Sequence, residues 1–118
     1  MFENVVVGAA DPERGARAVR RAVEVAQTSG GTVHIVTAFR QEPAEEVLAG
    51  FRRLASGSPV PVQTHPVRSD PVEAITRVAA EQEADLVVVG ARTGERSRRL
   101  SSVPQGVMDR VACAVLVV

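Results

Sequence analysis

The chain alternates between short apolar runs and longer segments in which apolar residues recur every three or four positions. Residues 5–8 and 86–89 are continuous apolar runs, which is typical of parallel strands buried on both faces. Recurrence at helical spacing between the runs indicates amphipathic helices. The pattern predicts strands at 5–8, 32–39, 60–67, 86–89 and 114–118, and helices at 12–29, 43–55, 71–83 and 104–111.

Proline, aspartate and glycine mark several of these boundaries. The Asp-Pro pairs at 11–12 and 70–71 each place a capping carboxylate before a proline at the first helical position. Two glycines at 30–31 end the first helix. Pro61 and Pro66 lie in the third strand and cannot donate to a neighbour, so we expect this strand at the edge of the sheet.

The alternation of strands and helices predicts an α/β protein with parallel strands and right-handed crossovers. With 118 residues, of which 45% are hydrophobic, the chain is long enough for one core and too short for two. We therefore expect a single domain over residues 1–118.

The charge composition limits the possible partners. All 14 basic residues are arginine and they balance 14 acidic residues, so no net field draws the chain to nucleic acid or to an anionic membrane. No Trp or Tyr accompanies the three phenylalanines, which leaves little for base stacking. The N-terminus lacks a basic leader and no apolar stretch is long enough to span a bilayer. We expect a cytoplasmic protein without nucleic-acid or membrane partners.

Residues able to do chemistry are few and scattered. Cys113 is the single cysteine, which excludes an internal disulfide, and its place before an apolar strand favours a core position. The spacing of His34 and His65 matches no local metal motif, so we expect packed or surface histidines and no metal site. P-loop, serine hydrolase and zinc protease motifs are absent from the sequence. We expect no catalytic residues and no enzyme activity.

Two sequence strings, and the order of the elements around them, resemble a known family. ADLVVVGAR at 84–92 and CAVLVV at 113–118 lie in an order of strands and helices that resembles the universal stress protein family from end to end. The resemblance implies a three-layer sandwich around a five-stranded parallel sheet in the order 3-2-1-4-5, similar to the adenine nucleotide alpha hydrolase fold. It also implies a homodimer, and an apolar edge strand favours such self-pairing. The dimer strand would consist of Ala114, Val115, Leu116, Val117 and Val118.

Many members of that family bind ATP, and this chain departs from their nucleotide-binding pattern. The pattern is GxxG followed, after a spacer, by Gly and then Ser or Thr, with an Asp at the end of the first strand. Gly90 matches the first glycine, but Thr93 and Ser101 replace the other two and the spacer between them is seven residues. Ala10 stands at the carboxylate position, and Asp11 is displaced into a helix cap. The resemblance places a degenerate site at Gly8, Ala10, Ala38, Gly90, Arg92, Thr93, Gly94, Ser101, Ser102 and Val103.

Two hypotheses about function follow from these departures. The favoured one is a non-enzymatic stress-response protein with weak or lost nucleotide binding and no cofactor, which acts through dimerisation or a protein partner. The alternative is a regulator that binds ATP with Mg²⁺, or another adenine nucleotide.

The arginines of the altered loop leave these hypotheses open. Guanidinium groups hold phosphate oxygens in bidentate fashion and could replace missing glycine contacts. The same segment also fits a solvated surface, because Glu95 lies among the arginines. The two serines before the last helix are equally suited to cap it or to contact an anion. The loop arginines are Arg92, Arg96, Arg98 and Arg99.

Overall fold

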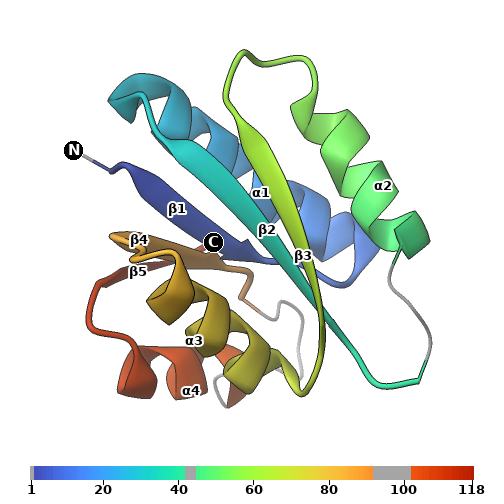
Figure 1. Ribbon diagram of the computed structural model, residues 1–118, viewed down its shortest axis with the longest axis vertical. Helices are drawn as coiled ribbons and strands as arrows, with labels where there is room; N and C mark the ends of the chain where they lie inside the picture. The colour runs from blue at the N-terminus through green and yellow to red at the C-terminus, as the bar shows by residue number, and fades with distance from the viewer. Residues whose placement is uncertain (1, 42–44, 92–101) are drawn as a thin grey trace.

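The computed structural model describes residues 2–41, 45–91 and 102–118, which form alternating strands and helices (Figure 1). In chain order these are β1 (Asn4–Gly8), α1 (Pro12–Ser29), β2 (Thr32–Phe39), α2 (Glu45–Ala55), β3 (Val62–Arg68), α3 (Pro71–Glu81), β4 (Leu86–Val89), α4 (Ser102–Arg110) and β5 (Ala114–Val117).

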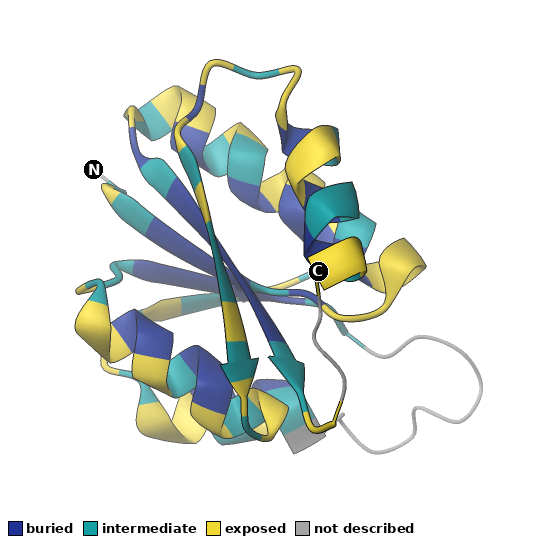
Figure 2. Ribbon diagram, turned by 45° about the vertical axis from the view of Figure 1, so that its right-hand side comes forward, coloured by how far each residue is buried: buried dark blue, intermediate teal, exposed yellow. Residues whose placement is uncertain are grey.

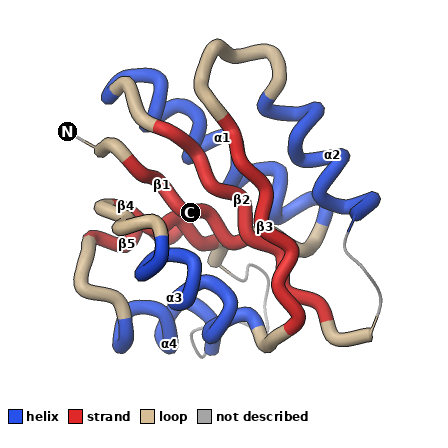
Figure 3. The backbone as a smooth tube through the Cα atoms, viewed as in Figure 1, coloured by secondary structure: helices blue, strands red, loops and turns tan. Residues whose placement is uncertain are grey.

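The strands form one parallel sheet in the order β3-β2-β1-β4-β5 (Figure 3). β1 is the central strand: Val6 is in register with His34 of β2 on one side and with Val87 of β4 on the other. The strand order implied by the family resemblance is therefore confirmed. β3 is an edge strand, as its prolines predicted, and β5 is the other edge strand.

Helices cover both faces of the sheet and produce three layers (Figure 2). Along β1, Val5 and Val7 face a core that also contains Ala18 and Val19 of α1. Val6 points the other way, into a second core formed with α3 and α4. This alternation explains why β1 is apolar at every position between its ends, because each face is buried under a helix.

The predicted starts of α1 and α3 are confirmed by the capping geometry. Asp11 has extended backbone angles and its carboxylate accepts a hydrogen bond from Arg14 N. Asp70 caps α3 in the same way, through a bond from Glu73 N. In both helices a proline occupies the first turn. N–H groups in that turn have no partner within the helix, so the lack of an N–H in proline costs no helical hydrogen bond.

Some element ends differ from the prediction. α3 ends at Glu81 rather than at 83, because Glu83 adopts a left-handed φ of 51° that reverses the chain toward β4. α4 begins at Ser102, two residues before the predicted start, so Pro104 lies in its first turn. β3 runs over Val62–Arg68 rather than 60–67. Residues 43 and 44 of the predicted second helix lie outside the described residues.

Candidate functional site

A cleft of about 290 Å³ opens at the carboxyl ends of β1, β2 and β4. From β1 the chain adds β2 and then β3 on one side, and it adds β4 and β5 on the other side of β1. Ligands of open α/β sheets bind at such switch points, because the connections on the two sides diverge and leave a crevice. The walls of the cleft come from these strand ends and from the first turns of α1, α3 and α4.

The start of α1 supplies the charged part of the cleft. Asp11 and Arg14 are the charged residues among the described lining. One carboxylate oxygen of Asp11 is occupied by the cap, at 2.8 Å from Arg14 N. The cleft is otherwise lined by glycine and apolar residues, so it suits a ligand with a flat apolar body and a few polar groups.

Two glycines of the lining have different roles. A Cβ at Gly8 would lie 2.4 Å from the Ile75 side chain, so this glycine permits the approach of α3 to the sheet. Among the described residues, a Cβ at Gly90 would meet only Arg14 O, at 3.7 Å, which is an ordinary van der Waals contact. The described residues therefore leave room at Gly90, and that room belongs to the cleft.

The end of β2 presents backbone hydrogen-bonding groups to the cleft. Even-numbered residues of β2 direct their N–H and C=O groups toward β1: Thr32 N donates to Glu3 O at 2.9 Å, and Val36 O accepts from Ala9 N at 3.0 Å. Ala38 continues this alternation beyond the end of β1 and lines the cleft. The backbone N–H and C=O of Ala38 therefore face the cleft. They could pair with an acceptor and a donor on the edge of a planar heterocycle.

The structure brings together part of the site that the sequence predicted. Gly8, Ala10, Ala38, Gly90 and Val103 line the cleft. The remaining predicted residues of the loop, Arg92, Thr93, Gly94 and Ser101, lie outside the described residues, as do Arg96, Arg98 and Arg99. Ser102 is the first residue of α4.

Sequence reasoning missed the residues that α1 and α3 bring to the cleft. Arg14 and Gly15 come from the first turn of α1, and Pro71 and Ile75 from α3. The Asp-Pro caps were a usable signal, since they predict helices that start immediately after strand ends. The closeness of those helices to β4 depends on packing, which the sequence pattern does not reveal.

The side chains considered for other chemistry form no metal-ligand cluster among the described residues. Cys113 is half-buried, and burial raises the pKa of its thiol, which disfavours the reactive thiolate. In the described ranges no three His, Cys, Asp or Glu side chains are grouped as metal ligands would be. None of the described helices combines the length and apolar character needed to cross a bilayer.

The fold and cleft define an α/β protein with an open cleft at the switch point of its parallel sheet. The model of the universal stress protein family matches residues 1–54 and 40–118 of the chain. A curated relative, universal stress protein MJ0531 of Methanocaldococcus jannaschii, is 29% identical over 90 residues, which cover 75% of this chain and 53% of the relative. The chain thus spans about half the length of that relative.

Solved structures agree with the family match. A universal stress protein in complex with cAMP is 34% identical, with a TM-score of 0.86 and coverage of 99% of this chain and 96% of that one. The universal stress protein from Archaeoglobus fulgidus in complex with dAMP is 22% identical, with a TM-score of 0.79 and coverage of 99% and 97%, and supports the fold. The chain belongs to the universal stress protein family.

Proposed function

We propose that this protein binds an adenine nucleotide with a single phosphate, such as cyclic AMP, in the cleft, and that it acts as a non-enzymatic stress-response protein. The observation that carries the proposal is the open cleft at the ends of β1, β2 and β4, with room at Gly90 and the backbone of Ala38 facing it. The similarity to a structure that holds cAMP supports the same ligand class.

The purine base is assigned to the β2 side of the cleft. A purine carries hydrogen-bond donors and acceptors on one edge, and the N–H and C=O of Ala38 offer the complementary pair. The apolar walls formed by Val36 and Ile75 would contact the faces of the ring.

A single phosphate fits this chain better than a triphosphate. Backbone N–H groups of a glycine-rich loop normally surround the phosphates of ATP, and the glycines permit that close approach. Here threonine and serine replace two of those glycines in the sequence, at 93 and 101. The volume of about 290 Å³ is just below the roughly 300–1,000 Å³ found for small-molecule sites. We therefore modify the sequence-based alternative: an adenine nucleotide is retained, whereas ATP with Mg²⁺ is not the preferred ligand.

Ligand-induced stabilisation tests the proposal. The thermal unfolding of the purified protein is followed with adenosine, cyclic AMP, AMP and ATP–Mg²⁺, and the affinities are measured by calorimetry. A ligand at about 100 times its dissociation constant adds about 2.7 kcal/mol of stability. We expect cyclic AMP or AMP to raise the melting temperature more than ATP–Mg²⁺ does. Absence of a shift with all four compounds would contradict nucleotide binding.

A substitution at Gly90 locates the site. Gly90→Ala adds a methyl group where the described residues leave room, so we expect unchanged stability without ligand and at least tenfold weaker nucleotide binding. Gly50→Ala is the matched control, since its Cβ also meets no close neighbour and lies in α2, outside the cleft. Equal affinity in the two variants would mean that the nucleotide binds elsewhere.

Our proposal includes a homodimer joined through β5. This strand is an edge of the sheet, and Val117 is 38% exposed there, among the large exposed hydrophobic residues of the described chain. Pairing of two copies would cover both the apolar side chain and the open backbone edge. In such a dimer both copies would form one surface for a protein partner. That partner could then distinguish protein with an occupied cleft from protein with an empty one.

A further inference from the structure

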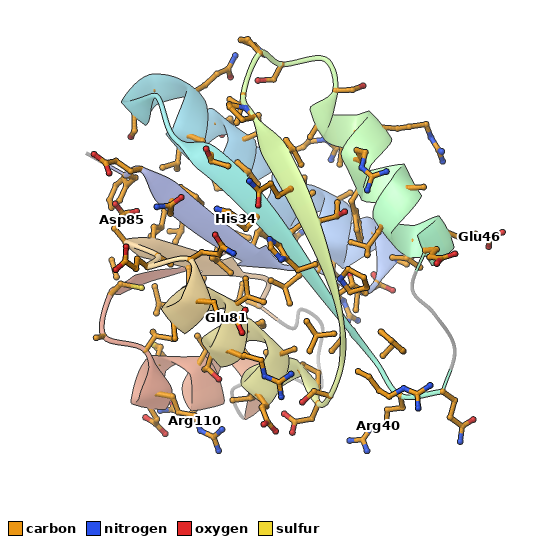
Figure 4. The ribbon with its side chains drawn as sticks, viewed as in Figure 1. His34, Arg40, Glu46, Glu81, Asp85 and Arg110 are labelled. Carbon is orange, nitrogen blue, oxygen red and sulfur yellow. The ribbon has the colours of Figure 1, made fainter. Side chains whose placement is uncertain are left out.

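Two histidines that are far apart in the sequence face each other across neighbouring strands. His34 Nδ1 lies 3.1 Å from His65 Nε2, and the ring centroids are 5.2 Å apart at an interplanar angle of 40°. The pair lies on the face of the sheet covered by α3, where Figure 4 labels His34 on β2 and Glu81 on the helix. These residues belong to no part of the cleft.

The hydrogen-bond partners determine where the protons of the neutral pair lie. The second nitrogen of His34, Nε2, is 3.2 Å from Asn4 Oδ1, and this amide oxygen only accepts. His34 Nε2 therefore carries the hydrogen and Nδ1 is the acceptor. It follows that His65 donates through Nε2–H, so that one proton occupies the space between the two rings.

Protonation affects the two rings differently. His65 can take a proton on Nδ1 while its Nε2–H still donates to His34. A second proton would have to bind to His34 Nδ1. Two N–H groups would then point at each other across the 3.1 Å between His34 Nδ1 and His65 Nε2. The two imidazolium rings would then repel each other without a shared hydrogen bond, and the strands would have to separate.

The surroundings of the pair supply little compensation for a second charge. His34 is only 2% exposed, and burial, followed by the His65 ring, lowers the pKa of His34. Burial also lowers the pKa of His65, while Glu81 of α3 opposes that change. Three further charged groups among the described residues already have partners: Glu73 and Arg77 of α3 pair with each other, and the Asp85 carboxylate accepts from Glu3 N and Asn4 N.

We infer that the His34–His65 pair is an acid-sensitive lock that holds the edge strand β3 to β2, accepts one proton and releases the strand on the second. β3 leads through Ser69 and Asp70 into α3, whose first residue, Pro71, lines the cleft. Release of β3 at low pH would therefore also affect the start of α3, which forms one wall of the cleft.

The pH dependence of unfolding tests the lock, because these are the only two histidines in the sequence. In the unfolded chain both take up protons below about pH 6.5. The folded protein binds fewer protons than the unfolded chain. The free energy of unfolding is therefore highest above that pH and decreases as the pH falls. We expect the unfolding equilibrium constant to rise about tenfold per pH unit below pH 6, which corresponds to one proton.

Two substitutions at His34 separate the lock from simple packing. The amide of His34→Gln can accept from His65 and donate to Asn4 but cannot titrate, so we expect stability near that of the parent protein at pH 8 and a much smaller pH dependence. His34→Leu removes both hydrogen bonds and should be less stable at every pH. Gln63→Ala, at an exposed position of β3, is the control and should keep the parent pH profile.

Nuclear magnetic resonance and hydrogen exchange give the decisive readouts. We expect Nε2–H tautomers for both rings at pH 8, protonation of His65 before His34, and loss of amide protection in β3 before β1 as the pH falls. Independent titration of both rings near pH 6.5 would overturn the inference. An unchanged pH profile in His34→Gln, or simultaneous loss of protection in all strands, would do the same.

Discussion

At the scale of single residues, buried polar groups hold the end of β1 in place behind the cleft. The Thr37 side chain is buried, and its hydroxyl donates to Ala9 O at 2.7 Å. Within the described part of the chain, every buried side-chain nitrogen and oxygen has a hydrogen-bond partner. The bond of Thr37 therefore fixes the backbone just after β1, where the cleft begins.

Removal of this hydroxyl should cost stability. Thr37→Val keeps the shape of the side chain and leaves Ala9 O without its donor, so we expect a loss of about 1–3 kcal/mol in the free energy of unfolding, measured by urea denaturation. Thr28→Val is the control: Thr28 also donates to a backbone oxygen, that of Glu24, but at an exposed site where water replaces the bond. A similar loss in both variants would show that burial is not the cause.

At the scale of elements, the helix caps should contribute to stability, and the cap that lines the cleft should contribute to the proposed nucleotide binding as well. Asp11 and Asp70 are equivalent caps, each followed by proline and each accepting from the backbone N–H three residues later. Asp11 lines the cleft, whereas Asp70 does not.

Parallel substitutions distinguish these two contributions. We expect Asp11→Ala and Asp70→Ala each to lower the free energy of unfolding by about 0.5–2 kcal/mol, and serine at either position to restore most of it. Calorimetry should show that Asp11→Ser still changes the affinity for cyclic AMP, since it removes a charge from the cleft, while Asp70→Ser does not. Equal affinities in the two serine variants would place Asp11 outside the binding surface.

The elements themselves were largely predictable from the sequence. Apolar runs identified the strands because both faces of the sheet are covered, and the Asp-Pro pairs identified two helix starts because capping is a local interaction. The ends of α3 and α4 were less well predicted. The left-handed turn at Glu83 and the placement of Pro104 inside the first turn of α4 have no distinct sequence signal.

The candidate site was only partly predictable. Strand-end residues such as Gly8 and Ala38 could be predicted because the family resemblance fixes which strands end together. Arg14 and Ile75 were not, because helix packing brings them to the cleft. The pairing of His34 with His65 also depends on tertiary structure: the register of β2 against β3 places these residues on one face of the sheet, although 31 positions separate them.

At the scale of the whole molecule, the exposed edge of β5 is the surface through which we propose that two copies pair. Val117→Arg places a charge on the edge strand, and we expect it to convert the proposed homodimer into a monomer, as measured by sedimentation velocity. Gln63→Arg changes the opposite edge of the sheet, in β3, and should leave the dimer intact. A monomeric parent protein, or dissociation by both variants, would contradict the β5 interface.

The strand order also has a consequence for synthesis on the ribosome. Of the five strands β1 is made first, yet one of its two neighbours, β4, begins only at Leu86, which pairs with Val5, and is complete only when Val89 has been added. Until then a nascent chain that has formed β3-β2-β1 exposes the unpaired side of its most apolar strand. Chaperone binding during translation is therefore most valuable before β4 emerges, and slow codons placed ahead of that strand would prolong the interval in which the growing polypeptide is prone to aggregate.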